Sequence, residues 1–487
     1  MKYLLCLGSL LLSSFMKLQA QSEDTLDKKF IISHVNIIDV TNGTVKKDMD
    51  VTIIGNRISY VRKSIAARTS KKAATIDATN KFLIPGLWDM HTHVLNHWDR
   101  HSLLFVANGI TGVRDMASGI PLHKSLIIKN QVYQGIQAGP QFITPGPPLD
   151  GEVSLYPHEA LFITSKERAI HVADSLKKAG ADFLKVINYI PRNAFFALLK
   201  RAKEIGMSVV GHTPFSVTPA QASNAGFRSI EHLMLVRETV CTKTDEVLQL
   251  SREASRARLK NDWLTVNALQ TKSLKLMLET LSENECIELG KLFVANDTWL
   301  TPTMRSILTK LLPKDSILNN PNWRYMPKDI LASWRTSLND TTMRGIANDL
   351  QYEQMRIKVT SLLHKAGAHF LAGTDANEKG LDNVPGFSLH EELEIFLSAG
   401  FTPLEALQTA TINPAVFLKA TDSLGTVGVG KIASLVLLDA NPLENIRNTK
   451  KIYAVVLNGR YLDRKALDDL LQEAEKRAGT MQRETND

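Results

Sequence analysis

The chain has 487 residues, of which 44% are hydrophobic and 22% charged, and its mean hydropathy is −0.10. This composition is typical of a large globular protein, and it excludes a disordered or collagen-like chain. The formal net charge of +8 is small for this length, and no dense basic cluster with interleaved aromatic residues occurs. We therefore expect no nucleic-acid partner.

Residues 1–20 have the layout of a cleaved secretory signal, with Lys2 at the start, an apolar run to Phe15 and a small residue, Ala20, at the end. A membrane anchor is the alternative, but the apolar run is short for a hydrocarbon layer of ~30 Å. Cleavage after Ala20 would remove Lys2 and Lys17 and lower the net charge from +8 to +6. We therefore expect a periplasmic or secreted protein that is free of the membrane after cleavage.

Only Cys241 and Cys286 follow the expected signal. A disulfide between them is one possibility in an oxidising compartment. A core of this size does not depend on a disulfide, so two free buried thiols are the favoured alternative. The sequence leaves both this redox state and the oligomeric state open, a homo-oligomer included.

Both ends of the chain contain short runs of alternating apolar and polar residues. Gly55-Asn56 and Asn458-Gly459 are hairpin-type turn signals between such runs. We predict that residues 28–84 and 422–465 together form one small β-sandwich domain. Residues 425–431 have the glycine and lysine spacing of a phosphate loop, but Ile432 stands where that motif needs Ser or Thr. We interpret this segment as a turn.

The middle of the chain, residues 85–421, alternates short apolar strands with amphipathic helical stretches, a pattern that indicates βαβ units. Eight such units predict an α/β protein with a (β/α)8 TIM-like barrel. A long helix-favouring stretch at 240–290 is predicted to be an insertion near the barrel mouth that influences substrate choice. Residues 466–487 are predicted to form a C-terminal helix and tail. The predicted barrel strands are 86–91, 111–115, 141–145, 183–187, 208–212, 229–232, 299–303 and 369–374.

Metal-competent residues gather at the C-terminal ends of these strands, where barrel enzymes place their active sites. His91 and His93 end the first strand, and residues at i and i+2 of a strand point the same way. Lys185 lies in an apolar strand, where an ordinary ammonium would be desolvated at a cost of several kcal/mol. Each group alone is a weak signal, but their placement together predicts a metal site. The remaining members of the set are His212, His232 and Asp375.

Three further features lie near the predicted mouth. His97 and His101 share one face of an expected helix and are candidates for substrate contact, with a surface position as the alternative. Residues 145–151 form a Pro/Gly-rich run that suits either substrate contact or a rigid loop. Tyr189 could stabilise a developing oxyanion or serve only in packing. No substrate-binding residue is assigned from the sequence.

Several of these segments resemble the amidohydrolase superfamily, in its imidazolonepropionase-like or Xaa-Pro dipeptidase-like branch. The resemblance covers nearly the whole chain after the signal. The last of its motifs usually contains Ala-Asp, where this chain has Ala433-Ser434. The matching segments are 83–93, 109–115, 180–186, 225–232, 373–375, 402–407, 413–415 and 430–436.

The resemblance implies two divalent metal ions, with zinc favoured by imidazole and carboxylate ligands. His91, His93 and Asp375 would hold the first ion, and His212 and His232 the second. Lys185, carboxylated by CO2, would bridge the two ions. The alternative within the branch is a single ion beside an unmodified lysine.

The implied activity is a metal-dependent amidohydrolase, in which a metal-bound hydroxide attacks an amide-type carbonyl. Asp375 would move the proton from the attacking water to the leaving nitrogen. The substrate class would be a dipeptide, an N-acyl amino acid or a cyclic amide. Hydrolysis of a lactone, ester or phosphotriester on the same centre is the alternative. A non-catalytic binding protein is disfavoured, because all six ligand positions are kept.

Overall fold

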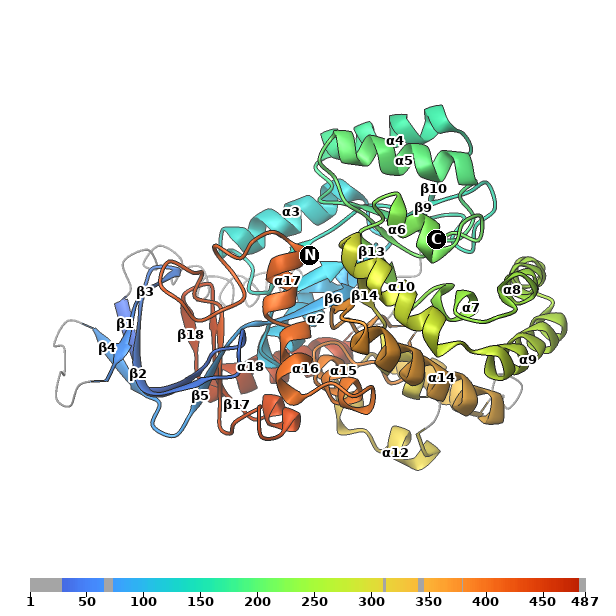
Figure 1. Cartoon of the computed structure of the whole chain (residues 1–487). Coiled ribbons are helices and arrows are strands. Elements are labelled where there is room, and N and C mark those ends of the chain that lie inside the picture. The colour runs from blue at the N-terminus through green and yellow to red at the C-terminus, as the bar shows by residue number, and fades with distance from the viewer. Residues whose placement is uncertain (1–28, 65–72, 310–311, 340–345, 379, 481–487) are drawn as a thin grey trace, which may run out of the picture.

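The computed structural model describes residues 29–64, 73–309, 312–339, 346–378 and 380–480. The expected signal segment, residues 1–20, lies outside these residues. The chain folds into a β-domain on one side and a larger α/β barrel on the other (Figure 1). Within the described ranges, no helix combines the length and the apolar character needed to cross a membrane.

The β-domain is built from both ends of the chain, as the sequence predicted. Its eight strands form one continuous sheet with the order β18-β17-β16-β5-β1-β2-β3, and β4 pairs with β1. The N-terminal part supplies β1 (Lys29–Ile38), β2 (Val45–Ile54), β3 (Arg57–Lys63), β4 (Ala74–Asp77) and β5 (Phe82–Pro85). The C-terminal part supplies β16 (Leu435–Leu438), β17 (Ile452–Leu457) and β18 (Arg460–Leu462).

The sheet curves around one core, in which Ile32 and Val51 from the N-terminal part pack with Leu435 and Val456 from the C-terminal part. The join between β5 and β16 is antiparallel, and it ties the two ends of the chain together. Residues 425–431 belong to this domain as a turn, since Gly430 N donates to Ile58 O at 2.8 Å.

The barrel contains the eight predicted strands in the predicted order, so the expected fold class is confirmed. Between β8 and β11, Asp182 N donates to Thr144 O at 3.0 Å. The ring closes where Thr92 bridges Ala376 and Met90 N donates to Ala372 O. The barrel strands are β6 (Leu87–Thr92), β7 (Ile110–Asp115), β8 (Gln141–Ile143), β11 (Leu184–Val186), β12 (Val209–Gly211), β13 (Ser229–Glu231), β14 (Trp299–Thr301) and β15 (His369–Phe370).

The last strand is shorter than predicted, because the residues after Phe370 bond to several different elements. Leu371 N donates to Leu300 O of β14, whereas Ala372 N donates to Thr409 O. Asp375 N donates to His91 O of β6. The segment that carries Asp375 is therefore irregular backbone held from three sides.

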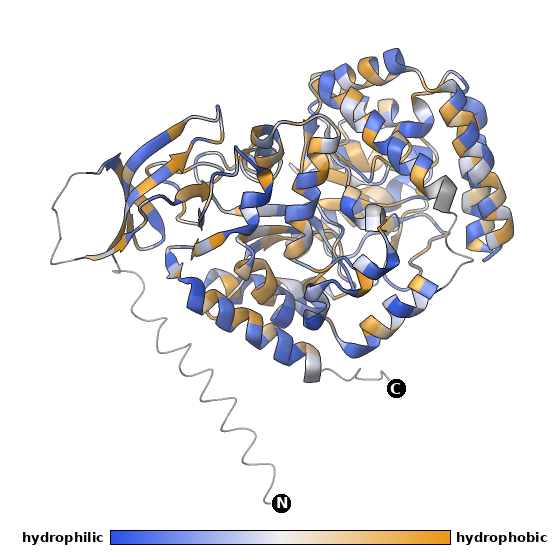
Figure 2. Cartoon of the chain, turned by 90° about the horizontal axis from the view of Figure 1, so that it is seen from below, coloured by the Kyte–Doolittle hydropathy of each residue, from blue (hydrophilic) through white to orange (hydrophobic). Residues whose placement is uncertain are grey.

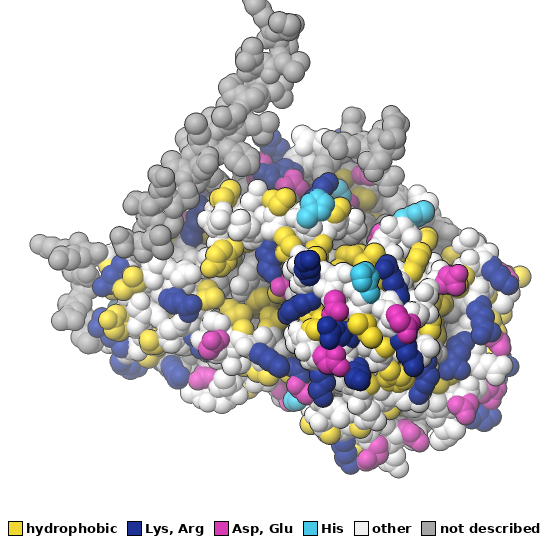
Figure 3. Space-filling view, turned by 90° about the horizontal axis from the view of Figure 1, so that it is seen from above, with side chains coloured by type: hydrophobic (Ala, Val, Ile, Leu, Met, Phe, Trp, Pro, Cys, Tyr) yellow, Lys and Arg dark blue, Asp and Glu magenta, His cyan; other side chains and the backbone are white. Residues whose placement is uncertain are grey.

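Helices surround the strands, and Figure 2 shows them with alternating hydrophilic and hydrophobic stretches. Oppositely charged side chains are interspersed on the face in Figure 3. The helices before residue 240 are α2 (Trp98–Ala107), α3 (Leu122–Tyr133), α4 (Lys166–Ala179), α5 (Arg192–Glu204), α6 (Pro219–Asn224) and α7 (Val236–Thr239). Those after residue 282 are α10 (Glu283–Ala295), α11 (Met304–Leu308), α12 (Lys314–Leu318), α13 (Lys328–Asn339), α14 (Ile346–Lys365), α15 (Phe387–Ser398), α16 (Pro403–Thr409), α17 (Ile412–Phe417) and α18 (Arg464–Thr480).

An extra helical hairpin, α8 (Thr244–Leu259) and α9 (Trp263–Thr280), follows the sixth barrel strand. Arg252 Nε donates to Phe215 O at 3.1 Å, and Ser255 bonds to the hydroxyl of Tyr189. Both contacted loops follow barrel strands, so α8 lies on the mouth side. The next helix, α10, packs against α6 and α14 of the outer ring. The inserted part therefore ends before α10 and not at residue 290.

A second excursion, which was not predicted from the sequence, follows β14 and includes α11, α12 and α13, whereas α14 belongs to the outer ring and leads to β15. At the C-terminus, α18 packs against α2 and buries Leu467 and Ala474. Cys241 and Cys286 are both buried and free. Burial raises the pKa of these thiols to about 11 and about 12, respectively.

Candidate metal centre

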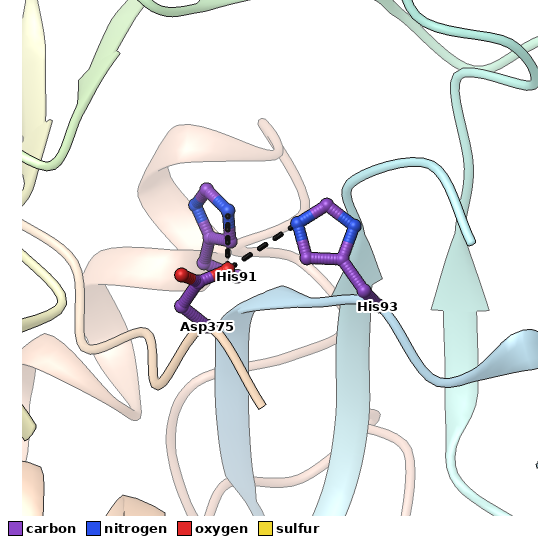
Figure 4. A group of neighbouring side chains, drawn as sticks. All are labelled: His91, His93 and Asp375. Atoms are coloured by element: carbon purple, nitrogen blue, oxygen red, sulfur yellow. Dashed lines mark ion pairs between the residues drawn. The ribbon is translucent and has the colours of Figure 1, made fainter. Parts of the chain in front are cut away.

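Two histidines at the mouth end of β6 turn the same ring nitrogen toward one carboxylate (Figure 4). His91 Nε2 lies 3.5 Å from Asp375 Oδ1, and His93 Nε2 lies 3.3 Å from the same oxygen. One ligand atom from each residue lies within 4.8 Å of the others. The alternation of side chains along β6 puts both rings on one face, and the segment after β15 brings the carboxylate to them.

The second nitrogen of each ring is held by an acceptor. His91 Nδ1 lies 2.7 Å from Glu231 Oε2, and His93 Nδ1 lies 2.5 Å from Ala117 O. Carboxylate and carbonyl oxygens only accept, so both Nδ1 atoms carry the proton and donate it. In the neutral rings, Nε2 then presents a lone pair to Asp375 Oδ1, which is itself an acceptor. Such converging acceptors are stabilised by a cation or by added protons between them.

Burial decides between these two possibilities. His91 is fully buried, and its Nε2 has no hydrogen-bond partner among the described residues. Burial lowers the pKa of this imidazole well below its ordinary value, although the charge of Asp375 opposes the shift. Added protons are therefore disfavoured on His91, and a divalent metal ion fits the three atoms better.

His212 and His232 extend the same group of rings. The ring centroids of His91 and His232 are 4.6 Å apart, and those of His212 and His232 are 5.0 Å apart. His212 Nδ1 lies 2.8 Å from Asn188 Oδ1, and His232 Nδ1 lies 2.6 Å from Thr303 Oγ1. In all four predicted histidines Nδ1 is held by the protein, which leaves Nε2 for a ligand.

Lys185 lies in β11 with only 5% of its surface exposed, and its Nζ donates to Met116 O at 2.6 Å. Burial lowers the pKa of this amine to about 8, although the charges of Asp375 and Glu231 oppose the shift. A neutral amine is the form that reacts with CO2. Lys185 pairs with Val210 of β12, two residues before His212, and the charge of Asp375 acts on its amine. The structure thus brings all six predicted residues to one end of the barrel.

The ionisation of the Asp375 carboxyl group depends on the groups around it. Burial raises its pKa, but a proton on His93 Nε2 or on the other surrounding rings would lower the pKa well below its ordinary value. Both Asp375 and His232 have a positive φ, of 56° and 59°. Non-glycine residues adopt this region at a cost of about 1–3 kcal/mol, although Asp and His adopt it more readily than most residues.

A buried ion pair supports His91, and the sequence analysis did not identify it as functional. Arg114 Nη2 donates to Glu231 Oε1 and Oε2 at 2.9 Å, and Glu231 accepts the proton of His91 Nδ1. The side chains of Arg114 and Glu231 are fully buried. The signal that could have revealed them is a charged residue at an inward position of an otherwise apolar strand.

Replacement of Arg114 by Ala should lower the free energy of unfolding by about 3–5 kcal/mol, because it leaves Glu231 buried without its cation. Urea unfolding of the metal-free protein would measure the change. The control is Lys465→Ala, which breaks an exposed pair with Asp469 and should cost under about 1 kcal/mol. A loss from Arg114→Ala no larger than that of the control would contradict the assignment.

The other predicted residues lie around the centre without joining it. His97 Nε2 lies 3.1 Å from Glu378 Oε2, and the Arg100 guanidinium also pairs with Glu378. His101 is fully buried, and burial lowers its pKa to about 3. The hydroxyl of Tyr189 turns to Ser255 of α8.

Comparison with known proteins agrees with this architecture. The Amidohydrolase family profile matches residues 82–462. Adenine deaminase 2 of Jannaschia sp. (strain CCS1) is 31% identical over 120 residues, which are 24% of this chain and 19% of that protein. The chain thus matches about a fifth of the length of this curated relative.

Two solved structures share the fold. Bottromycin amidohydrolase has a TM-score of 0.73 at 20% identity, over 95% of this chain and 94% of that chain. A Xaa-Pro dipeptidase with bound methionine in its active site has a TM-score of 0.63 at 18% identity, over 90% of this chain and all of that chain. The profile covers most of the sequence and includes all six residues of the candidate centre, so the chain belongs to the amidohydrolase family.

Proposed function

We propose that the protein is a metal-dependent hydrolase that cleaves a carbon–nitrogen bond in an amide-type substrate. The observation that carries this proposal is the group of acceptors formed by Nε2 of His91, Nε2 of His93 and Oδ1 of Asp375. The names of the relatives, a deaminase and two amide-bond hydrolases, support the same reaction class. Dipeptides, N-acyl amino acids and cyclic amides are the substrate classes to test.

Two divalent ions, with zinc favoured, fit the donor set. His91, His93 and Asp375 would hold one ion, His212 and His232 the other, and a carboxylated Lys185 would supply an oxygen to each. Bound ions of this kind polarise a carbonyl and lower the pKa of water to about 7. The lowered pKa of the Lys185 amine favours carboxylation, because a larger fraction of the amine is uncharged at neutral pH.

The protein side chains would then orient the substrate and move the proton. Asp375 would be ionised as a ligand of a cation, because an opposite charge favours its ionised form, so it could accept a proton from the attacking water. The same carboxyl group would return the proton to the leaving nitrogen. Glu231 and Ala117 O fix the rings of His91 and His93, and thereby keep Nε2 directed at the centre.

A substrate panel tests this function. Protein reconstituted with zinc should hydrolyse at least one amide in a set of dipeptides, N-acyl amino acids and cyclic amides. Chelation should abolish this activity, and added metal should restore it. Turnover of lactones, esters or phosphotriesters alone would reject the carbon–nitrogen assignment. Ligand binding without turnover of any substrate would indicate a binding protein.

The helical hairpin α8–α9 is proposed to contribute to substrate choice. Its first helix is bonded to the loops after β11 and β12, which border the mouth of the barrel. Exchange of this hairpin for a short loop should change the relative kcat/KM values within the panel more than it changes metal content.

Export remains a proposal based on residues 1–20. We expect the mature protein to begin near Gln21 and to be periplasmic or secreted, since a small residue, Ala20, ends the apolar segment. N-terminal sequencing of protein from the native host would measure this. An intact Met1 on protein recovered from the cytosol would contradict it.

A further inference from the structure

A buried carboxylate outside the metal ligands lies at the mouth of the barrel. Asp150 ends the two-residue strand β9 (Leu149–Asp150), which pairs with β11 through Leu149 and Val186. Ile187 N also donates to Leu149 O at 2.9 Å. Asp150 therefore lies beside the strand of Lys185, at the level of Ile187.

The alternation of side chains places Asp150 on the inner face of the barrel. Leu149 packs in the same outer core as Leu184 and Val186 of the neighbouring strand. The next residue along a strand points to the opposite face, so Asp150 points inward, as Lys185 does. Two residues of strand separate Lys185 from Ile187, a rise of about 7 Å. Asp150 thus lies further toward the mouth than Lys185, by about the length of one amino-acid residue of a substrate.

One oxygen of Asp150 is used by the protein and the other is not. Oδ1 accepts Tyr189 N at 2.6 Å and Gly151 N at 2.9 Å. Oδ2 is buried and has no hydrogen-bond partner among the described residues, and Asp150 as a whole is 0% exposed. No ion pair between Asp150 and a described Lys or Arg occurs within 4 Å. A buried carboxylate oxygen without a hydrogen-bond donor destabilises the folded protein. A ligand that supplies a donor would remove this cost.

Burial and hydrogen bonding act in opposite directions on the ionisation of this carboxyl group. Burial raises its pKa to about 6, while bonds from Tyr189 N, the Ser154 hydroxyl and Gly151 N oppose the shift. Ser154 thus lies near the group, although not in bonding geometry with Oδ2. A buried carboxylate of this kind would bind a cationic or N–H group of a ligand more strongly than it binds water.

Aromatic side chains lie on the segments around this carboxylate. Burial raises the pKa of the Tyr156 phenol, and the charges of Asp375, Glu159 and Asp150 raise it further. The ring of Tyr189, whose backbone N–H binds Asp150, packs near Phe215 with centroids 5.7 Å apart. The aromatic rings of Tyr189 and Phe215 thus lie on the same side of the mouth as the carboxylate.

We infer that Asp150 binds the free amino group of the substrate through Oδ2, on the acyl side of the amide bond that is cleaved. This inference rests on the proposed function and narrows its substrate class to amides of amino acids with an unblocked amine, such as dipeptides. N-acyl amino acids and cyclic amides lack this cation next to the scissile carbonyl.

Asp150→Asn tests the inference, because Asn keeps an Oδ1 acceptor for the two backbone N–H groups and loses the anionic oxygen. The substrates are a dipeptide and its des-amino analogue, which has hydrogen in place of the amino group. The variant should lose about 10- to 100-fold in kcat/KM on the dipeptide and less than about 3-fold on the analogue. The matched control, Glu152→Gln, removes an exposed carboxylate two residues away and should change neither value.

Equal losses on both substrates, or a thermal midpoint lowered by more than a few degrees, would show that Asp150 is only structural and would overturn the inference. Equal activity of wild type and variant on the dipeptide would also overturn it. If the metal-loaded wild type cleaves no amide at all, the proposed function fails. Calorimetric measurement of ligand binding then tests separately whether Asp150 binds an amino group. L-leucinamide should bind wild type more tightly than N-acetyl-L-leucinamide, and Asp150→Asn should abolish that preference. Equal affinities in wild type would reject the amine site.

Discussion

Replacement of Asp375 by Asn should lower turnover by at least about 10²-fold while the fold stays intact. General acid–base catalysis contributes about 10²–10⁴-fold, and an amide can neither accept nor return the proton. The oxygen that would be weakened as a ligand is Oδ1, which lies 3.3 Å from His93 Nε2 and 3.5 Å from His91 Nε2.

Asn is the right replacement because Asp375 has a φ of 56°. Asn tolerates this left-handed region better than most residues, so the substitution adds little backbone strain. Turnover would be measured on the best amide of the panel, with metal content and the thermal midpoint determined for the same preparation. The control is Asp439→Asn, an exposed aspartate of the β-domain. Near-normal turnover by metal-replete Asp375→Asn would reject the assigned role.

Metal analysis of reconstituted protein should find about two divalent ions per chain and a carbamate on Lys185. An unmodified ammonium at this buried position would be disfavoured by two cations, because like charges destabilise the ionised form. Carboxylation makes the group anionic and supplies two oxygens. One metal per chain and an unmodified amine, under saturating bicarbonate and metal, would contradict the two-metal centre.

Lys185→Ala should remove one metal and most of the activity, and short-chain carboxylates should restore part of both. The reason is that an added carboxylate can occupy the space of the missing side chain and offer its two oxygens to the ions. Lys129→Ala is the matched control, since Lys129 pairs with Asp182 at the surface, away from the centre. Unchanged metal content in Lys185→Ala would show that the lysine is not a ligand.

The barrel could be predicted from the sequence because it follows from local periodicity, and the candidate ligands were found at the ends of its predicted strands. His91 and His93 share a face since strand side chains alternate, and the ends of parallel strands meet at one rim. The eighth strand was the least accurate of the predicted strands. Its middle, residues 370–372, is apolar, but after Phe370 the backbone bonds to β14, β6 and the segment at Thr409.

Other features depended on contacts between segments far apart in the chain. No local pattern indicates that Glu231 holds both His91 and Arg114, since these residues come from three different strands. The β9 strand is only two residues long, and its pairing with β11 decides that Asp150 faces inward. The sequence by itself therefore determined the barrel and the β-domain that both ends of the chain form, and it singled out six candidate ligands. Only the tertiary structure decided which ring nitrogen faces the centre and which buried carboxylate keeps an unpartnered oxygen, because burial and hydrogen bonding are set by the neighbours that folding brings together.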